Sequence, residues 1–166
     1  MTESLDFPRT YARLLPPIRA KCRRLLGHSA AAEDVAQEVF LRFWQWGEEQ
    51  GIPTDVRVVM AWLYRTSTRL AIDALRARRR TGDTEVPSEA LPCAIDLDSH
   101  LVARRAVAWL ASSVPEEELA AAVLCRVDGV TQPEAATVLG VSERTVRRLL
   151  ERFDERIEGL RKEFSA

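Results

Sequence analysis

The segment Glu143–Arg156, ERTVRRLLERFDER, carries five arginines in a chain whose formal net charge is only −1. Arginine guanidinium groups bind phosphates and can donate two hydrogen bonds to guanine, which discriminates between bases by about 1–3 kcal/mol. This segment therefore predicts DNA binding. The alternative is a solvated helix face on which the interleaved glutamates pair with arginines four residues away. On a helical wheel, one half carries the candidate DNA-binding residues Arg144, Thr145, Arg147, Arg148 and Arg152.

The other residue types that could carry chemistry form no recognisable site. Cys22, Cys93 and Cys125 are far apart in the sequence, and neither His28 nor His100 lies near a pair of cysteines. We find no serine–histidine–aspartate grouping, no glycine-rich phosphate loop and no HExxH motif. We therefore expect no metal, no cofactor and no catalysis by this chain.

The arginines lie within a sequence that predicts a helix-turn-helix. Thr131 and Glu134 have the form of a capping box, Gly140 predicts a helix end, and Ser142 predicts the N-cap of the next helix. We expect helices at about 132–139 and 142–163, the second of which would enter the major groove of DNA. The predicted buried stripe of the second helix consists of Val146, Leu149, Leu150, Phe153, Ile157 and Leu160.

The rest of the chain predicts an all-α protein, because few segments alternate with the period of two that strands require. Pro16 and Pro17 predict the start of a helix that ends at Gly27. Ser29 predicts the N-cap of a helix that runs to about Trp46. Further helices are expected at about 54–80, 100–112 and 115–128.

The helix at 54–80 carries a second candidate nucleic-acid surface. An indole and four arginines fall within about 60° of one another on the wheel. Arginines can follow the backbone of an unpaired strand while an aromatic ring stacks on a base, which contributes about 1–3 kcal/mol. The alternative is that the tryptophan packs in the core beside the predicted core stripe of Val59, Leu63, Thr66 and Leu70. The candidate nucleic-acid residues are Trp62, Arg65, Arg69, Arg76 and Arg80.

The helix that begins near Ser29 has a polar strip without positive charge. Asp34, Gln37, Leu41 and Gln45 recur along one side. Such a strip favours docking to a protein over binding to nucleic acid, although one exposed leucine is also ordinary. The apolar face of the same helix consists of Val35, Val39, Phe40, Phe43 and Trp46.

Charge and composition predict two small domains. Residues 1–85 hold 14 basic and 11 acidic residues, whereas residues 86–166 hold 10 and 14. Between the patterned parts, residues 81–99 contain two prolines, five acids and no base, which predicts a flexible acidic linker. We expect domains at 1–80 and 100–166. With no apolar run near about 20 residues and no secretory signal, we expect a cytoplasmic protein without membrane insertion.

Three stretches together resemble a known family: AEDVAQEVFLRFW, AWLYRTSTRLAIDALRARRR and VPEEELAAAVLCRVDGVTQPEAATVLGVSERTVRRLLERF. Their order and spacing are similar to those of the bacterial extracytoplasmic-function (ECF) group of RNA polymerase sigma factors. The resemblance implies that residues 1–80 dock on core RNA polymerase, through its β′ and β subunits, and recognise and melt the −10 promoter element. Residues 100–166 would bind the −35 element. An anti-sigma factor is a further implied partner.

The resemblance also implies roles for individual residues. Segment Pro53–Val59 corresponds to a loop that captures a flipped −10 base, with Trp62, Arg65, Arg69 and Arg76 on the helix behind it. The arginines of 144–152 correspond to the −35-reading helix. Arg69 stands where the family usually has asparagine. Leu149, Glu151 and Asp154 stand where family members often have basic residues. The residues that correspond to the motif against the polymerase β′ coiled coil are Asp34, Gln37, Glu38 and Leu41.

Two other functions remain open at this point. A stand-alone helix-turn-helix regulator would bind intact duplex as a dimer without polymerase. A sigma-like protein could instead act only by binding partners. A sequence without the arginine face would indicate that role.

Overall fold

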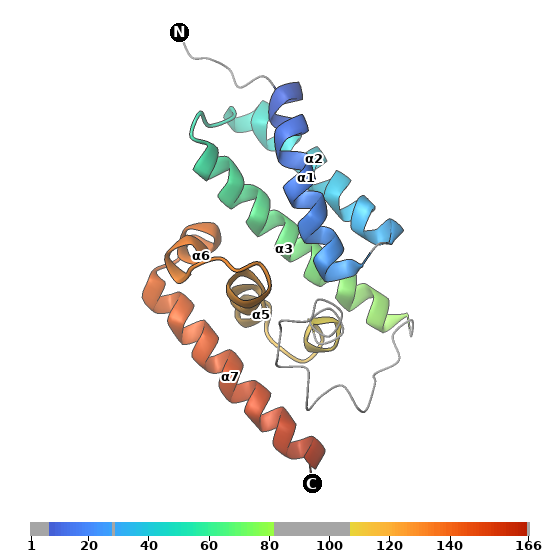
Figure 1. Ribbon diagram of the computed structural model, residues 1–166, viewed down its shortest axis with the longest axis vertical. Helices are drawn as coiled ribbons and strands as arrows, with labels where there is room; N and C mark the ends of the chain where they lie inside the picture. Colours follow the sequence, from blue (N-terminus) through green and yellow to red (C-terminus); the bar gives the residue numbers. More distant parts are fainter. Residues whose placement is uncertain (1–6, 28, 82–106, 166) are drawn as a thin grey trace. The chain divides into compact units, whose positions relative to one another are not determined.

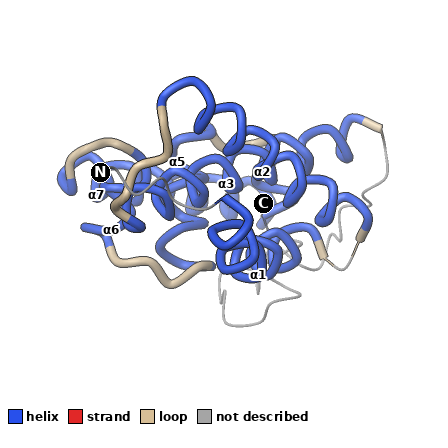
Figure 2. The backbone as a smooth tube through the Cα atoms, turned by 90° about the horizontal axis from the view of Figure 1, so that it is seen from above, coloured by secondary structure: helices blue, strands red, loops and turns tan. Residues whose placement is uncertain are grey.

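The computed structural model describes residues 7–27, 29–81 and 107–165 (Figure 1). All regular secondary structure within these residues is helical, which confirms the predicted all-α class (Figure 2). The predicted linker at 81–99 lies outside the described residues, apart from Thr81. A short helix spans residues 107–110. The other helices are α1 Phe7–Leu26, α2 Ala30–Gln50, α3 Val56–Arg80, α5 Glu116–Ala122, the π-helix Val123–Val127, α6 Gln132–Leu139 and α7 Glu143–Ser165.

The chain divides into two compact units, Met1–Ala71 and Ile72–Ala166. The boundary falls inside α3, so the last turns of this helix count with the second unit. The first unit holds α1, α2 and most of α3. The second holds the helix-turn-helix formed by α6 and α7.

Helix α1 begins before the two prolines, so the prediction that Pro16 and Pro17 start it is wrong. Each proline removes one helical N–H, and a proline inside a helix ordinarily costs about 3 kcal/mol. The helix continues because one apolar face runs through this region without a break. Leu14 and Ile18, on either side of the prolines, are both buried. Burial of that face outweighs the lost hydrogen bonds.

Helix α1 packs beside α2, and the pair is joined by charge as well as by aromatic rings (Figure 1). Arg23 Nη2 lies 2.6 Å from Glu33 Oε1, and Arg19 Nε lies 2.9 Å from Glu33 Oε2. Tyr11 of α1 meets Phe40 of α2 edge to face, with ring centroids 4.9 Å apart. Because Glu33 lies in the first turn of α2, its carboxylate also interacts favourably with the helix dipole.

Two expectations about α2 need correction. Ser29 occupies the N-cap position, but its side chain does not cap the helix. Its hydroxyl instead donates to the carbonyl oxygen of Leu26 at 3.2 Å. The helix also continues beyond Trp46 to Gln50, and it ends at Gly51, whose φ of 76° favours glycine.

The buried side of α3 differs from the predicted core stripe. Val59 and Leu63 are buried as predicted, but Thr66 and Leu70 are only half-buried. Ser67 and Thr68 are fully buried instead. Both hydroxyls donate to the carbonyl oxygen of Tyr64, at 3.0 and 2.8 Å, so these polar groups enter the core with their hydrogen bonds made.

In the second unit, α7 packs against α5 and α6. The expected helix at 115–128 is α5 followed by the π-helix, in which Asp128 N–H donates to the Val123 carbonyl oxygen at 3.0 Å. A π-helical turn widens the helix, and propensity patterns do not reveal it. The predicted stripe of α7 is buried from Val146 to Ile157, and Leu160 is half-buried.

Candidate nucleic-acid and protein interfaces

The start of α7 is held in place by the caps that the sequence predicts. The Thr131 N–H donates to Glu134 Oε2 at 2.9 Å, and Glu134 N–H donates to Thr131 Oγ1 at 3.4 Å. Gly140 ends α6 in the left-handed region with φ 69°. Thr145 N–H then donates to Ser142 Oγ at 3.1 Å, which caps α7. The helix-turn-helix geometry is therefore confirmed.

The arginine face of α7, Arg144, Arg147, Arg148 and Arg152, is exposed along its whole length. Thr145 is half-buried between these arginines and the core. Within the described chain, the ion pairs of α7 use other positions, and none of the four arginines takes part in one. The alternative in which neighbouring glutamates neutralise this face therefore does not occur in the structure. The four guanidinium groups are available to an anionic partner.

Two charged residues of α7 have structural roles. Asp154 forms a bidentate pair with Arg126 of the π-helix, at 2.6 and 2.8 Å. Arg156 forms another with Glu118 of α5, at 2.9 and 3.2 Å, and hydrogen bonding to this carboxylate raises the pKa of Arg156. The negative charge of Asp154 is thus compensated by Arg126, so it does not cancel the positive charge of the arginine face.

The α2 residues that the resemblance assigns to docking on polymerase are Asp34, Gln37, Glu38 and Leu41, and most of them are exposed. Asp34 and Gln37 are exposed, and the Leu41 side chain is 53 % exposed. Glu38 is half-buried and pairs with Arg42, with Nε and Oε1 2.7 Å apart. Sequence reasoning missed Trp44, which is 46 % exposed one turn after Leu41. Its spacing of three residues from Leu41 could have revealed it.

Trp62 of α3 packs against other aromatic side chains of the first unit and remains partly exposed. Its indole stacks on Trp46 of α2, with ring centroids 5.3 Å apart and planes inclined by 18°. The ring centroid of the fully buried Phe43 lies 5.8 Å from that of Trp62. Trp62 nevertheless remains half-exposed. The indole is therefore partly used for packing, and its assignment to nucleic acid stays a prediction.

The predicted arginines of α3 do not all lie in one unit. Arg65 is half-buried and Arg69 is exposed, both in the first unit. Arg76 and the exposed Arg80 belong to the second. Arg76 Nε donates to the Ala111 carbonyl oxygen at 2.6 Å, and its Nη1 lies 3.2 Å from Glu116 Oε2. The assignment of these arginines to DNA stays a prediction.

The loop before α3 is anchored at both of its ends. A Cβ added to Gly47 of α2 would lie 2.7 Å from Ile52 Cγ1, so the loop approaches α2 closely at this glycine. At the other end, Asp55 Oδ1 accepts from the Arg57 N–H at 2.9 Å, and the Arg57 side chain contacts both carboxylate oxygens. These hydrogen bonds from Arg57 lower the pKa of Asp55.

The described residues contain neither a candidate metal site nor a candidate membrane-spanning helix. No group of three histidine, cysteine, aspartate or glutamate side chains is placed to hold a metal ion; Cys93, His28 and His100 lie outside these residues. None of the described helices is both long enough and apolar enough to span a membrane.

Comparison with known families matches both halves of the chain. Residues 10–81 match Sigma-70 region 2, and residues 113–161 match the Homeodomain-like domain. The ECF RNA polymerase sigma factor SigE of Mycolicibacterium smegmatis is 33 % identical over 137 residues, which are 78 % of this chain and 51 % of SigE. The ECF RNA polymerase sigma factor SigL of Mycobacterium tuberculosis is 33 % identical over 132 residues, which are 75 % of this chain and 71 % of SigL.

The chain therefore spans about half the length of SigE but most of SigL. Among solved structures, it is similar to the sigma factor RpoE in its co-crystal structure with the anti-sigma factor NepR from Bartonella quintana. The TM-score is 0.51 at 18 % identity, with 95 % of this chain and 97 % of RpoE covered. At this identity the likeness supports the fold.

Proposed function

The chain belongs to the ECF RNA polymerase sigma factors, and we propose that it directs core RNA polymerase to specific promoters and initiates transcription there. It acts by binding and has no catalysis of its own. The observation that carries the proposal is the arginine face of α7, which is exposed, makes no ion pair with any residue that the structure describes, and is positioned by a capped helix-turn-helix. The organisation we propose is a docking and −10 domain at 1–80, a linker at 81–99 and a −35 domain at 100–166.

The arginine face of α7, with Thr145, binds the −35 element. Arginines at the start of a recognition helix reach base edges, while those further along contact phosphates. Each phosphate that is neutralised releases counterions, so binding weakens as salt rises. Since the acids Asp154 and Glu118 are already paired within the fold, they do not repel the DNA.

The α3 face binds and opens the −10 element. Trp62 offers its free side to an unpaired base, while Arg65, Arg69 and Arg80 hold the backbone. Stacking offsets the cost of unstacking the duplex, which is a few kcal/mol for each base. Arg76 can join this face only after it releases the carbonyl oxygen of Ala111 and the carboxylate of Glu116.

The polar strip of α2 docks on core polymerase, through its β′ subunit, and we add Trp44 to the strip. Leu41 and Trp44 bury apolar area on docking, whereas Asp34 and Gln37 supply hydrogen-bond acceptors and charge. The β subunit is a further contact of the bound protein. We also propose an anti-sigma partner that covers these surfaces, and a cytoplasmic location for the chain.

Run-off transcription tests this function. Core RNA polymerase without its own sigma is incubated with the full chain and a library of genomic fragments. We expect promoter-specific transcripts that are lost with Arg147→Gln/Arg148→Gln and with Leu41→Asp. The first variant should still associate with core polymerase in a pull-down, and the second should not. A chain that binds core polymerase but yields no specific transcript would instead be a sequestering protein, and one that binds only duplex DNA would be a stand-alone regulator.

A further inference from the structure

Trp44 of α2 is the largest exposed apolar side chain among the described residues, and its indole is held by the first residue of α1. The side chain is 46 % exposed. Within the described residues, the aromatic ring that contacts it is Phe7, with ring centroids 4.5 Å apart and planes inclined by 87°. This edge-to-face arrangement is favourable for two aromatic rings. The contact therefore restricts the orientation of a side chain that would otherwise sample several rotamers in solvent.

Phe7 is itself held against the core of the first unit. Its ring is inclined by only 23° to that of Phe43, with centroids 5.9 Å apart, and Phe43 is fully buried. A second ring of α1, Tyr11, lies 6.1 Å from Phe7 and meets Phe40 of α2 at 4.9 Å. A series of ring contacts thus leads from the buried rings of α2 through Phe7 to the exposed indole.

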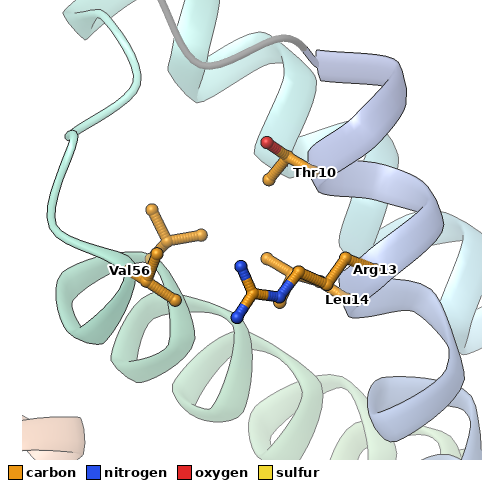
Figure 3. A pocket seen from close by; sticks show the side chains of 5 residues that line it. Thr10, Arg13, Leu14 and Val56 are labelled. Atoms are coloured by element: carbon orange, nitrogen blue, oxygen red, sulfur yellow. The ribbon is translucent and has the colours of Figure 1, made fainter.

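The next turns of α1 are anchored independently of Phe7. Thr10 and Leu14 are buried beside a small pocket between α1 and the first turns of α3 (Figure 3). Its free volume is about 30 Å³, which has room for a water molecule or two and for no larger ligand. Replacing Phe7 should therefore change the surroundings of Trp44 and leave this part of α1 in place. The pocket is lined by Thr10, Arg13, Leu14, Val56 and Val59.

The surface around Trp44 combines apolar area with negative charge. Leu41 lies three residues before Trp44, so the two side chains are neighbours on the exposed side of α2. Asp34 and Glu48 are exposed seven residues before and seven residues after Leu41, on the same side of the helix. Such a surface fits a partner with an apolar groove and basic residues at its rim.

We propose that Phe7 is a positioning residue for docking on core RNA polymerase, because its ring holds the Trp44 indole in the orientation that the polymerase binds. This inference rests on the proposed function. Tryptophans that enter well-packed pockets contribute a large share of the binding free energy at protein interfaces. An indole that is already oriented loses less side-chain entropy on binding. Phe7 thus increases the affinity for polymerase by acting through Trp44.

The test measures the affinity of the full chain for immobilised core RNA polymerase by biolayer interferometry. Trp44→Ala should weaken binding by at least about 30-fold, as expected for an interface anchor. Phe7→Leu removes the flat ring but keeps an apolar side chain. It should weaken binding by roughly 2–12-fold, which corresponds to the ordering cost of one large side chain. Phe7→Tyr retains the ring and should bind as the unchanged chain does.

A double variant separates positioning from direct contact with the polymerase. If Phe7 acts through Trp44, Phe7→Leu should cause no further loss in a chain that already carries Trp44→Ala. Leu14→Ala is the matched control for stability, because Leu14 is buried in the same helix seven residues after Phe7. It should lower Tm at least as much as Phe7→Leu does, yet bind polymerase within about twofold of the unchanged chain while folded.

Fluorine NMR of the chain labelled with 5-fluorotryptophan reports the orientation of the indole directly. The Trp44 signal is identified by its loss in Trp44→Phe. Phe7→Leu should move this signal towards its position in the urea-unfolded chain, whereas Leu14→Ala should leave it in place. The signals of Trp46 and Trp62 should also stay in place, since their rings contact Phe43 and each other.

Three results would overturn the proposal: polymerase binding that Phe7→Leu leaves unchanged, an equal loss from Phe7→Leu with and without Trp44→Ala, or a Trp44 signal that does not move. Should Phe7→Leu lose helical signal, Phe7→Met takes its place, since it keeps an apolar side chain of similar volume without a ring. A chain that gives one of these results and still drives run-off transcription keeps the proposed function and loses only the role of Phe7.

Discussion

Arg156→Gln should weaken the second unit by removing the partner of a carboxylate that water barely reaches. The Glu118 side chain is 7 % exposed, and Arg156 holds both of its oxygens, at 2.9 and 3.2 Å. Losing one member of a fully buried pair costs about 3–5 kcal/mol. The Arg156 side chain is 42 % exposed, so solvent screens this pair and rehydrates part of the carboxylate. We therefore expect a loss of about 1–3 kcal/mol.

Thermal and urea unfolding followed by far-UV circular dichroism measure this loss. For a domain of about 60–100 residues, a change of about 2 kcal/mol corresponds to a fall in Tm of roughly 8–16 °C. Adding Glu118→Gln to Arg156→Gln should recover part of the lost stability, because the double variant leaves no buried charge unpaired.

The control is Arg152→Gln on the same helix, where the arginine is exposed and makes no ion pair within the described chain. It should change stability by less than about 0.5 kcal/mol. The reasoning is refuted if Arg156→Gln costs no more than Arg152→Gln, or if the added Glu118→Gln change deepens the loss instead of relieving it.

Three further outcomes follow from other contacts. Arg147→Gln should reduce the slope of log affinity against log salt for −35 duplex by about 0.9, measured by anisotropy; an unchanged slope would remove this arginine from the interface. The hydrogen bonds from Thr131 lower the pKa of Glu134 in the folded protein below its ordinary 4.5. The stabilisation by the ionised carboxylate is therefore fully present above pH 4.5, and it is lost as the pH falls through the lowered pKa of the folded state. Glu134→Gln should remove this acid dependence of Tm while it retains an acceptor for Thr131; an unchanged pH profile would contradict the assignment. Gly47→Ala would normally stabilise a helix by about 0.5–1 kcal/mol, but its Cβ would meet Ile52, so we expect Tm to stay level or fall.

Local signals in the sequence were enough to place the helix-turn-helix. The capping box of Thr131 and Glu134, the left-handed Gly140 and the Ser142 cap involve residues within a few positions of one another. Their hydrogen bonds depend on short-range geometry alone, so a pattern of residue types reveals them. The exposure of the α7 arginines follows from the same helical period, because the opposite stripe is apolar and buried.

Local signals misled where packing outweighed propensity. The predicted start of α1 was wrong because Pro16 and Pro17 are strong signals for a helix boundary in a sequence. In the structure, the burial of Leu14 and Ile18 keeps the helix continuous through both prolines. Thr66 was predicted in the core where Ser67 and Thr68 are buried instead. Their hydroxyls donate hydrogen bonds to the carbonyl oxygen of Tyr64. A polarity scale assigns one value to each residue type and does not include such local hydrogen bonds.

By itself, the sequence determined the helical class, the helix-turn-helix, the exposed arginine face of α7 and the family, because these depend on residue type and on spacing along the chain. Only the tertiary structure decided which charges remain available. Asp154 and Arg156 look like parts of the same charged helix surface as Arg147, yet they pair with Arg126 and Glu118, which lie 28 and 38 residues away in the chain. The same holds for Trp62 on Trp46 and for the pocket between α1 and α3. Such contacts join side chains that are distant in sequence, and no periodicity within one helix specifies them.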